Sequence, residues 1–458
     1  MNKNLKKKLL AFAAVSTLAI SSLGVPFTEA HAKTAAQKDP EIKNIIFLIG
    51  DGMGTSYTSA YRYLKNSPNS KFVGRTEFDK YLVGQQMTYP EDTKENVTDS
   101  ASAATAMSAG VKTYNNAIAV DNDESEVTTV LETAKKVGKS TGLVATSEIT
   151  HATPAAFGAH DPSRKNMNGI ADDYYDELIN GKHKVDVLLG GGTSLFIRKD
   201  RDLVKEFKKD GFSYVTTKKE LQKNKNKQVL GLFATGGLDK MIDRSAETPS
   251  LADMTNSAID RLKQNKKGFF LMIEGSQIDW AGHDNDIVSA MSEMEDFEKA
   301  FKAAIDFAKK DKHTLVVATA DHSTGGFTIG ANDTYNWFGE PIKAAKRTPD
   351  YIAKKIANGA DVEKTLKEYI KLNLTTEEIQ SVKDATAKKE IDIDNAIEKI
   401  FDTRTNTGWT TGGHTGEDVP VYAYGPSSSK FAGQIDNTDN AKIIFNILNN
   451  KKTVIKDK

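Results

Sequence analysis

The sequence predicts an α/β fold: a three-layer sandwich with a central, mostly parallel sheet flanked by helices, and a helical insertion near the C-terminal third. Short apolar runs rich in branched residues recur along the chain, and each ends in a polar or glycine cluster. Helical patterns separate most of these runs, and strands that alternate with helices form parallel sheets covered on both faces. The residues from about 333 to 408 break this rhythm, because they are charged, helical in pattern and contain no core strand.

Seven expected strands follow one another along the chain. They are the runs at 44–52, 140–148, 185–192, 228–234, 268–275, 313–322 and 419–426. In open sheets of this kind, ligands bind beyond the carboxyl ends of the strands. We therefore expect the functional residues to follow these runs.

The N-terminal 32 residues have the pattern of a secretory signal peptide. "MNKNLKKKLL" supplies four lysines, an apolar run extends from Leu9 to about Val25, and "AHA" ends at Ala32. A membrane anchor is the alternative, but the run is short and is interrupted by serine, threonine and glycine. We expect cleavage near Ala32, secretion or association with the cell envelope, and no stable membrane insertion. One domain then spans residues 33–458.

The composition of the 458-residue chain narrows the classes of function. Its formal net charge is zero, which gives no sign of specific binding to nucleic acid or to an anionic membrane. It has no cysteine, so a thiolate nucleophile and thiolate zinc ligands are excluded. An exported chain without disulfides must be held together by its core, by metals or by oligomerisation.

Acidic residues follow three of the expected strands. Asp51 follows "IIFLIG", Glu274 follows "FFLMI", and Asp321 with His322 follows "TLVVATA". Any one of the carboxylates could cap a helix. Three carboxylates at one edge of a sheet crowd negative charge into a cleft, which is costly unless cations compensate it. This crowding favours a metal site over helix caps.

Three of the eight histidines strengthen the metal hypothesis. His283 lies four residues after Asp279, which places both on one helix face at a spacing that suits a shared metal. His322 is next to a carboxylate, and His414 lies in "TGGHTGED" ahead of the run at 419–426. Mixed histidine and carboxylate ligands without sulfur suit catalytic zinc, whereas ligands that are all oxygen suit magnesium.

A serine in "VTDSASAATAMSAG" is a candidate nucleophile. The small residues from Ala101 to Ala109 favour a helix, and Ser100 stands at its first turn. An N-cap serine is the alternative interpretation. At a helix N-terminus the dipole and free N–H groups favour anions, and a metal bound to the serine oxygen can generate the alkoxide without a histidine base.

Two further residues lie in "TSEITHATPAAFGAHDPSR", at 146–164. Thr153 offers an oxygen ligand, and Arg164 has a planar fork that matches two phosphate oxygens. We expect His160, in the same segment, and His183 to pack or to face solvent rather than to bind metal. "DNDESEVTTVLE", at 121–132, mimics a calcium loop, but its sixth residue is Glu126 where the turn needs glycine, so we interpret it as the polar start of a helix.

Six motifs together resemble the bacterial alkaline phosphatases. They are "IGDGMG", "TDSASAATA", "HATPAA" with the following "SR", "EGSQIDWAGH", "TADHSTGG" and "GGHTGEDV". Their order and spacing match from about Glu41 to the C-terminus, apart from the helical insertion. Each motif alone is weak, but the joint pattern is highly specific.

The resemblance implies a site for two zinc ions and one magnesium ion. The implied ligands are Asp279, His283 and His414 for the first zinc, Asp51, Asp321 and His322 for the second zinc, and Asp51, Thr153 and Glu274 for magnesium. Ser100 would attack phosphorus and form a phosphoserine, while Arg164 would hold the nonbridging oxygens. Homodimers are common in the family, so a homodimer is expected by analogy alone.

Two positions depart from the best-studied members of that family. His151 and Trp280 stand where those members have an aspartate near the magnesium and a lysine that reaches phosphate through water. Both side chains are candidates for positions just outside the ligand set. Because both charges are absent, we expect product phosphate to be held less tightly here.

The function expected from these features is that of a secreted alkaline phosphatase, which hydrolyses phosphate monoesters to an alcohol and inorganic phosphate. A phosphodiesterase or sulfatase on the same scaffold is the nearest alternative, and a non-catalytic metal- or phosphate-binding protein is another. Sulfatases mature a residue within C/S-x-P-x-R, and "DSASA" has no such proline. Related diesterases commonly have threonine at the position of Ser100, and a binding protein needs no nucleophile there.

Overall fold

The computed structural model describes residues 41–67 and 70–449. The expected signal peptide, residues 1–32, lies outside the described residues. Within the part of the chain that the structure describes, no helix has the length and apolar character needed to cross a membrane.

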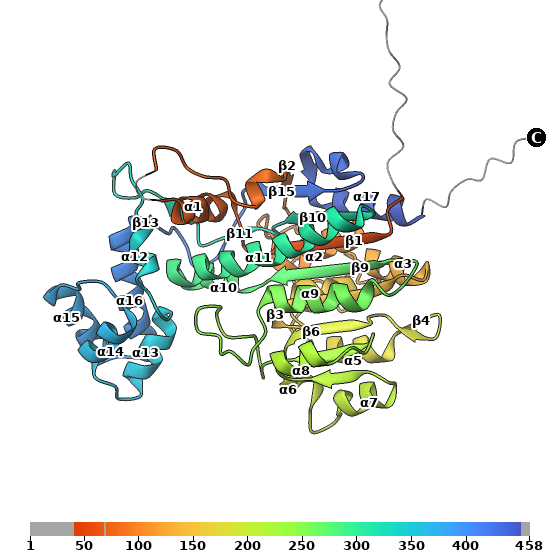
Figure 1. The fold of residues 1–458 in the computed structure, drawn as a ribbon, viewed down its shortest axis with the longest axis horizontal. Helices are drawn as coiled ribbons and strands as arrows, with labels where there is room; N and C mark the ends of the chain where they lie inside the picture. The colour runs from red at the N-terminus through yellow and green to blue at the C-terminus, as the bar shows by residue number, and fades with distance from the viewer. Residues whose placement is uncertain (1–40, 68–69, 450–458) are drawn as a thin grey trace, which may run out of the picture. The chain divides into compact units, whose positions relative to one another are not determined.

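A ten-stranded sheet runs through the centre of the domain (Figure 1). Its strand order is β16–β2–β15–β10–β1–β9–β3–β6–β8–β7, and all neighbours are parallel except β15, which is antiparallel to both β10 and β2. The strands are β1 (Asn44–Gly50), β2 (Leu82–Met87), β3 (Ser140–Glu148), β6 (Val187–Gly191), β7 (Ser213–Val215), β8 (Val229–Leu232), β9 (Phe269–Gly275), β10 (Thr314–Thr319), β15 (Val419–Tyr424) and β16 (Gly433–Asp436). Each of the seven predicted runs contains one of these strands.

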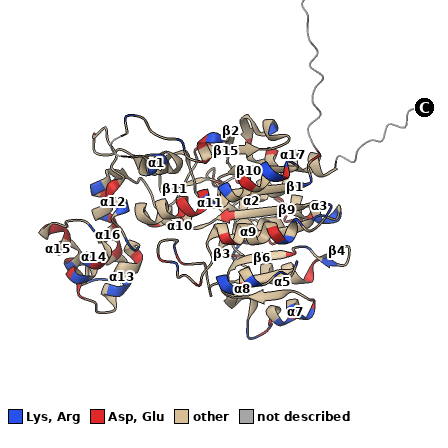
Figure 2. Cartoon of the chain, in the orientation of Figure 1, with Lys and Arg blue, Asp and Glu red and all other residues tan. Residues whose placement is uncertain are grey.

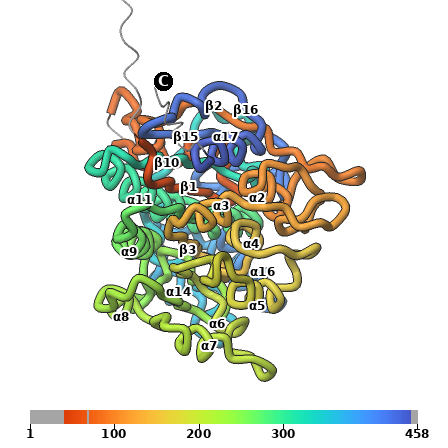
Figure 3. The backbone as a smooth tube through the Cα atoms, turned by 90° about the vertical axis from the view of Figure 1, so that its right-hand side faces the viewer, coloured from red at the N-terminus to blue at the C-terminus, as the bar shows by residue number. Residues whose placement is uncertain are grey.

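Helices cover both faces of the sheet, as the alternation of strands and helices predicts. One face carries α1 (Thr55–Lys65), α9 (Leu251–Leu262) and α11 (Ile287–Asp311). The other carries α2 (Ser100–Ala109), α3 (Val130–Lys136), α4 (Ala152–Gly158), α5 (Met167–Asp176), α7 (Leu203–Lys209) and α17 (Asn437–Asn449). Figure 3 shows α9 and α11 on one side of β1 and β3, with α2, α3 and α4 on the other.

Each central strand is buried on both faces, which explains its continuous apolar run. In β1, Ile46 and Leu48 contribute to one core, while Ile45, Phe47 and Ile49 contribute to the other. Side chains of a strand alternate between faces, and a sheet covered on both sides therefore needs apolar residues at every position. The predicted three-layer α/β fold is confirmed.

The predicted insertion is a group of helices between two short strands. The chain leaves β12 (Thr328–Ile329), which pairs with β13 (Thr407–Gly408). Between them lie α12 (Glu340–Lys343), α13 (Pro349–Ala357), α14 (Val362–Tyr369), α15 (Thr376–Ala385) and α16 (Glu390–Thr405). Figure 2 shows both signs of charge on α13, α14 and α15, as expected for helices with one face in solvent.

The remaining elements are short. They are α6 (Thr193–Phe196), α8 (Lys218–Lys223), α10 (Gln277–Asp284), the paired strands β4 (Leu178–Ile179) and β5 (Lys182–His183), the paired strands β11 (Ser323–Thr324) and β14 (His414–Thr415), and the 3₁₀ helices Phe78–Lys80 and Ser428–Phe431. In sequence, α10 follows the carboxyl end of β9, β11 follows that of β10, and β14 precedes the amino end of the antiparallel β15. All three therefore lie near one edge of the sheet, where they contribute residues to the site described below.

Candidate active site

The carboxyl ends of three neighbouring strands bring their acidic residues together. In β1, Ile49 pairs with Thr319 of β10 on one side and with Glu274 of β9 on the other. Asp51 and Asp321 follow directly after β1 and β10, and both are fully buried, as is Glu274. These strand ends meet at one edge of the sheet, as predicted from the sequence.

The turn after β1 depends on glycine. Gly52 has a positive φ of 70°, and its N–H donates to Asp321 Oδ1 at 3.0 Å. A Cβ atom at this position would lie 2.8 Å from Cα of Asp279, which is too close for any side chain. Only glycine therefore allows the turn to orient Asp321 while α10 packs against it.

Ser100 is the first residue of α2 and is not its cap. The cap is Asp99, whose Oδ1 accepts a hydrogen bond from Ser102 N at 3.0 Å. Ser100 is 1% exposed, and its Oγ lies 3.1 Å from Nε2 of His322 and 3.5 Å from Oδ1 of Asp51. The alternative interpretation of Ser100 as a structural N-cap is therefore wrong.

Three oxygen atoms converge on one nitrogen of His322. Its Nε2 lies 3.1 Å from Ser100 Oγ, 3.2 Å from Asp321 Oδ2 and 3.5 Å from Asp51 Oδ1. In a Ser-His-Asp triad the carboxylate contacts Nδ1 and the serine contacts Nε2, on opposite sides of the ring. Here all three share one side, which is the arrangement of ligands around a cation.

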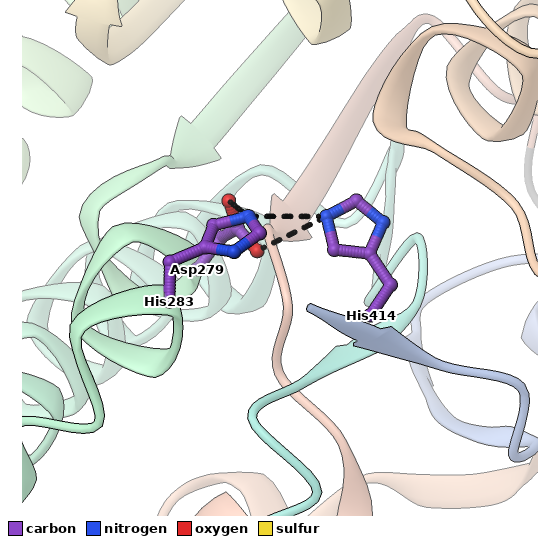
Figure 4. A group of neighbouring side chains, drawn as sticks. All are labelled: Asp279, His283 and His414. Carbon is purple, nitrogen blue, oxygen red and sulfur yellow. Dashed lines mark hydrogen bonds and ion pairs between the residues drawn. The ribbon is translucent and has the colours of Figure 1, made fainter. Parts of the chain in front are cut away.

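A second group consists of Asp279 and His283 from α10 and His414 from β14 (Figure 4). The two Nε2 atoms lie 3.2 Å apart, and the carboxylate oxygens of Asp279 lie 3.2 Å from His283 Nε2 and 3.6 Å from His414 Nε2. The spacing of Asp279 and His283 on one helix face is as predicted.

Backbone carbonyl groups set the orientation of both imidazoles in this second group. His283 Nδ1 lies 2.7 Å from Gly412 O, and His414 Nδ1 lies 2.8 Å from Thr98 O. A carbonyl only accepts, so each Nδ1 carries the hydrogen. When Nε2 is deprotonated, as metal binding requires, each ring directs its Nε2 lone pair toward the other. Metal-binding histidines are typically held in this way.

A third group of buried oxygens has no hydrogen-bond partner. Asp51 Oδ2, Glu274 Oε1 and Thr153 Oγ1 are buried without a partner, although Glu274 Oε2 accepts from Ser276 Oγ at 2.7 Å. A ligand atom of His151 lies within 4.8 Å of those of Asp51 and Glu274. Unpaired buried acceptors are costly, and a cation bound by them would remove the cost.

The electrostatics of the site also call for positive charge. Burial, followed by the charge of Asp321, raises the pKa of Asp51 well above its usual range. Burial raises the pKa of Glu274 to about 7. In the second group, the hydrogen bond to Asp279 raises the pKa of His283 to about 9. Either protons or metal ions must compensate these carboxylates, and both can occupy the same positions.

Arg164 is held by two neighbours beside Ser100. Its Nη1 donates to Asp99 Oδ2 at 3.0 Å, and its Nη2 donates to His151 Nε2 at 3.1 Å. Burial, and then the charge of Arg164, lower the pKa of His151 to about 3, so this ring is neutral and its Nε2 accepts. The Trp280 ring packs edge-on to His151, with the ring centroids 5.8 Å apart.

Thr324, which was not predicted from the sequence, links the two histidine groups. Its Oγ1 donates to Asp279 Oδ1 at 2.5 Å and lies 3.3 Å from His322 Nδ1. The threonine oxygen can accept from Nδ1–H, which leaves the Nε2 lone pair of His322 directed at Ser100. The only sequence signal was a hydroxyl residue two positions after His322. The role of Asp99 as both helix cap and partner of Arg164 was also missed.

Comparison with known proteins gives consistent results over nearly the whole chain. The model of the family described as "Alkaline phosphatase" matches residues 42–450. "Alkaline phosphatase 3" of Bacillus subtilis (strain 168) is 71% identical, over 97% of this chain and 98% of that protein.

Solved structures agree with this result. The cold-active alkaline phosphatase of a psychrophilic Shewanella sp. is 41% identical, with a TM-score of 0.84, over 88% of this chain and 99% of that one. A histidine-to-aspartate mutant of TAB5 alkaline phosphatase, described with magnesium bound in its M3 site, is 32% identical. Its TM-score is 0.64, over 89% of this chain and 98% of that chain.

Proposed function

The chain belongs to the alkaline phosphatase family, and we propose that it hydrolyses phosphate monoesters to an alcohol and inorganic phosphate, with Ser100 as the nucleophile. The observation that carries this proposal is the convergence of Ser100 Oγ, Asp51 and Asp321 on the single atom Nε2 of His322. This geometry favours a serine activated at a metal centre over a serine activated by a histidine base.

Two zinc ions fit the two histidine-containing groups. The first would be held by Asp279, His283 and His414, and the second by Asp51, Asp321 and His322. Nitrogen and oxygen donors without sulfur suit zinc at a catalytic centre. When bound, two such cations neutralise negative charge on the entering and leaving oxygens of phosphoryl transfer.

A magnesium ion fits the oxygens of Asp51, Thr153 and Glu274, which are buried without a hydrogen-bond partner. We propose that His151 stays outside this ligand set. Its Nε2 accepts from Arg164, so its Nδ1 carries the hydrogen and has no lone pair to offer.

The proposed hydrolysis consists of two displacements at phosphorus. Ser100 Oγ forms a bond to phosphorus as the ester P–O bond breaks, and the serine proton ends on the departing alcohol. A water oxygen then forms a bond to phosphorus as the bond from phosphorus to Ser100 Oγ breaks. A proton of that water ends on Ser100 Oγ. Asp99 and His151 leave three of the five N–H groups of Arg164 available for the nonbridging phosphate oxygens.

We also propose that the protein is secreted or associated with the cell envelope after cleavage near Ala32. The lysine-rich start and the interrupted apolar run support this proposal. A homodimer is proposed by analogy with the family alone.

One assay tests the proposed function. Aryl phosphate, aryl phosphate diester and aryl sulfate are compared side by side, with and without a chelator. We expect the monoester to be the preferred substrate, and we expect the chelator to abolish its hydrolysis. Ser100→Ala is expected to lower kcat by at least about 10³-fold, whereas Ser108→Ala, a buried serine of the same helix that donates to Ala156 O, keeps its activity. Activity that resists the chelator, or a preference for the diester or the sulfate, contradicts the proposal.

A further inference from the structure

A fourth group of metal-binding residues lies outside the candidate active site. Glu126, His160 and Glu177 each offer one ligand atom, and these atoms all lie within 4.8 Å of one another. Glu126 is exposed, in a turn whose ends pair as Val120 and Glu126, while the other two residues follow α4 and α5. The His160 side chain is only 4% exposed, so the expectation that this residue packs is met, but one ring nitrogen lacks a partner.

The hydrogen bonds of His160 identify which nitrogen is free. Its Nε2 lies 3.2 Å from the carbonyl oxygen of Val127, and since a carbonyl only accepts, Nε2 carries the hydrogen. The neutral ring then has its lone pair on Nδ1, which is buried and has no hydrogen-bond partner. This Nδ1 faces Glu177 Oε2 at 3.7 Å. Glu177 Oε2 also accepts a hydrogen bond from Lys184, and the Glu177 side chain is 33% exposed. The unsatisfied group is therefore the buried Nδ1, which a cation or a proton would satisfy.

Negative charge exceeds positive charge around this histidine. Glu132 Oε2 lies 3.8 Å from Nε2, and Asp173 Oδ2 accepts from the backbone N–H of His160 at 3.3 Å. Lys184 forms an ion pair with Glu177. The carboxylates near the ring or the backbone of this residue are Glu126, Glu132, Asp173 and Glu177. One lysine does not balance four carboxylates, so a divalent cation would improve the local charge balance.

We propose that Glu126, His160 and Glu177 bind a structural zinc ion, separate from the proposed catalytic metals. One imidazole nitrogen and two carboxylate oxygens, without sulfur, form a ligand set that suits zinc. The carbonyl of Val127 orients the imidazole in the way that backbone carbonyls orient metal-binding histidines elsewhere. Because Glu126 is exposed, water can reach the fourth position and the ion can enter from solvent.

Such an ion would brace the segment that carries Arg164. Asp161 exchanges two backbone hydrogen bonds of 2.9 Å with Ile118, and Arg164 N donates to Asn116 O at 2.8 Å. Past Ile118 the chain turns and reaches Glu126, while His160 directly precedes Asp161. Zinc bound to Glu126 and His160 would therefore join the two strands of this ladder. This role goes beyond the proposed hydrolysis and requires no change in its chemistry.

Zinc content tests the proposal on the whole protein. The parent, Glu126→Gln, His160→Gln and the matched control Glu124→Gln are dialysed to equilibrium against the same buffered zinc, and bound zinc is measured by mass spectrometry. Glu124 is an exposed glutamate two residues from Glu126 and is not part of the group. We expect the parent and Glu124→Gln to hold one more zinc per chain than Glu126→Gln and His160→Gln.

The Glu126→Gln comparison stands even if His160→Gln fails to fold, because Glu126 is exposed. The proposal is overturned if the parent, Glu126→Gln and Glu124→Gln bind the same amount of zinc per chain. That result would mean that a proton on His160, rather than a metal ion, lies between His160 and Glu177. The proposal is also overturned if Glu126→Gln and Glu124→Gln lose the same amount of zinc. Zinc binding would then depend on the negative charge of the surface rather than on Glu126 as a ligand.

Discussion

Two regions of this protein bury several carboxylates, and they differ in what surrounds them. At the edge of the sheet, Asp279 and Asp321 lie beside imidazoles whose Nε2 atoms point inward. The second region, which we call the insertion seam, consists of Asp286, Asp394 and Glu398, where the insertion helix α16 faces the start of α11. The difference leads us to expect that metal ions compensate the buried carboxylates in the first region and that protons compensate them in the second.

At the insertion seam, the neighbours of each carboxyl are mostly other carboxyls. Burial, and then Asp286, raise the pKa of Glu398 to about 11, and burial, and then Asp350, raise that of Asp394 to about 9. Asp286 differs because it caps α11, with Oδ1 accepting from Val288 N at 2.8 Å and Ser289 N at 3.0 Å. Asp394 and Glu398 are therefore expected to be protonated near neutral pH, whereas the sheet edge is expected to hold metal ions.

The largest effect is expected from a matched pair of variants, one in each region, which tests the comparison between them. Asp321→Asn removes a carboxylate that contacts His322, and we expect kcat/KM to fall by at least about 10²-fold, with loss of bound zinc. Asp394→Asn makes the same change in a carboxyl that is expected to be protonated already, so activity and metal content stay within about twofold of the parent. Steady-state kinetics and metal analysis on both variants check this. If Asp394→Asn lost metal and activity as Asp321→Asn does, the distinction between the regions would fail.

Thr324 offers a finer test of the catalytic region. Thr324→Val keeps the shape of the side chain but removes the hydroxyl between Asp279 and His322. We expect about a tenfold loss of zinc affinity or of kcat, because both ligands lose the group that orients them. Zinc titration of the apoprotein, read by recovery of activity, measures the effect. An unchanged titration would mean that Thr324 only packs there.

A substitution at Trp280 tests whether added positive charge increases the affinity for phosphate at the sheet edge. Trp280→Lys is expected to strengthen inhibition by inorganic phosphate by roughly three- to tenfold, since a cation would then stand near the bound anion. Trp280→Gln, which removes the indole without adding charge, is the control. Inhibition constants for phosphate from steady-state assays measure the effect. Unchanged or weaker inhibition in Trp280→Lys would contradict the expectation that a cation at this position strengthens phosphate binding.

The smallest effect concerns the pH dependence of stability at the insertion seam. Burial, and then the charge of Asp286, raise the pKa of Glu398 from its ordinary 4.5 to about 11 in the folded protein, so the folded state binds the proton more tightly than the unfolded state. Stability from this group is therefore complete below about pH 4.5 and is lost progressively as the pH rises toward 11.

Glu398→Gln removes this loss of stability. We expect parent and variant to be similar near pH 5, and the variant to be more stable by about 1–3 kcal/mol near pH 9. Urea unfolding with metals present measures both, and Glu390→Gln, an exposed position on the same helix, is the control. A gap that shrinks as the pH rises would contradict the assignment of protons to the seam.

The parts of the fold that the sequence predicts are those buried on both faces. The run "NIIFLIG" is apolar throughout because β1 has a core on each side. The edge strands β7 and β16, and β2 beside β16, were not predicted: β2, "LVGQQM", is partly exposed, and β7 and β16 have only three and four residues. The antiparallel direction of β15 was also missed, because it depends on the path of the chain through the insertion rather than on local residues.

In the candidate site, too, some residues can be predicted from the sequence and others cannot. Residues such as Asp51 and His322 stand out because carboxylates and imidazoles at strand ends are costly without a cation. Thr324 and Asp99 do not stand out, since a hydroxyl or a helix cap is common anywhere in a sequence and becomes informative only when its partners are known. For the same reason, the sequence placed the insertion but not the burial of Glu398 against Asp286.

The most direct test of the comparison between the two regions is anomalous diffraction at the zinc absorption edge, from crystals grown with zinc and magnesium. Besides the peak expected at Glu126, His160 and Glu177, we predict one peak between the Nε2 atoms of His283 and His414 and another beside Nε2 of His322, each about 2.0–2.2 Å from its ligand atoms. We predict no peak among Asp286, Asp394 and Glu398. A zinc peak at the insertion seam, or none between His283 and His414, would contradict the account.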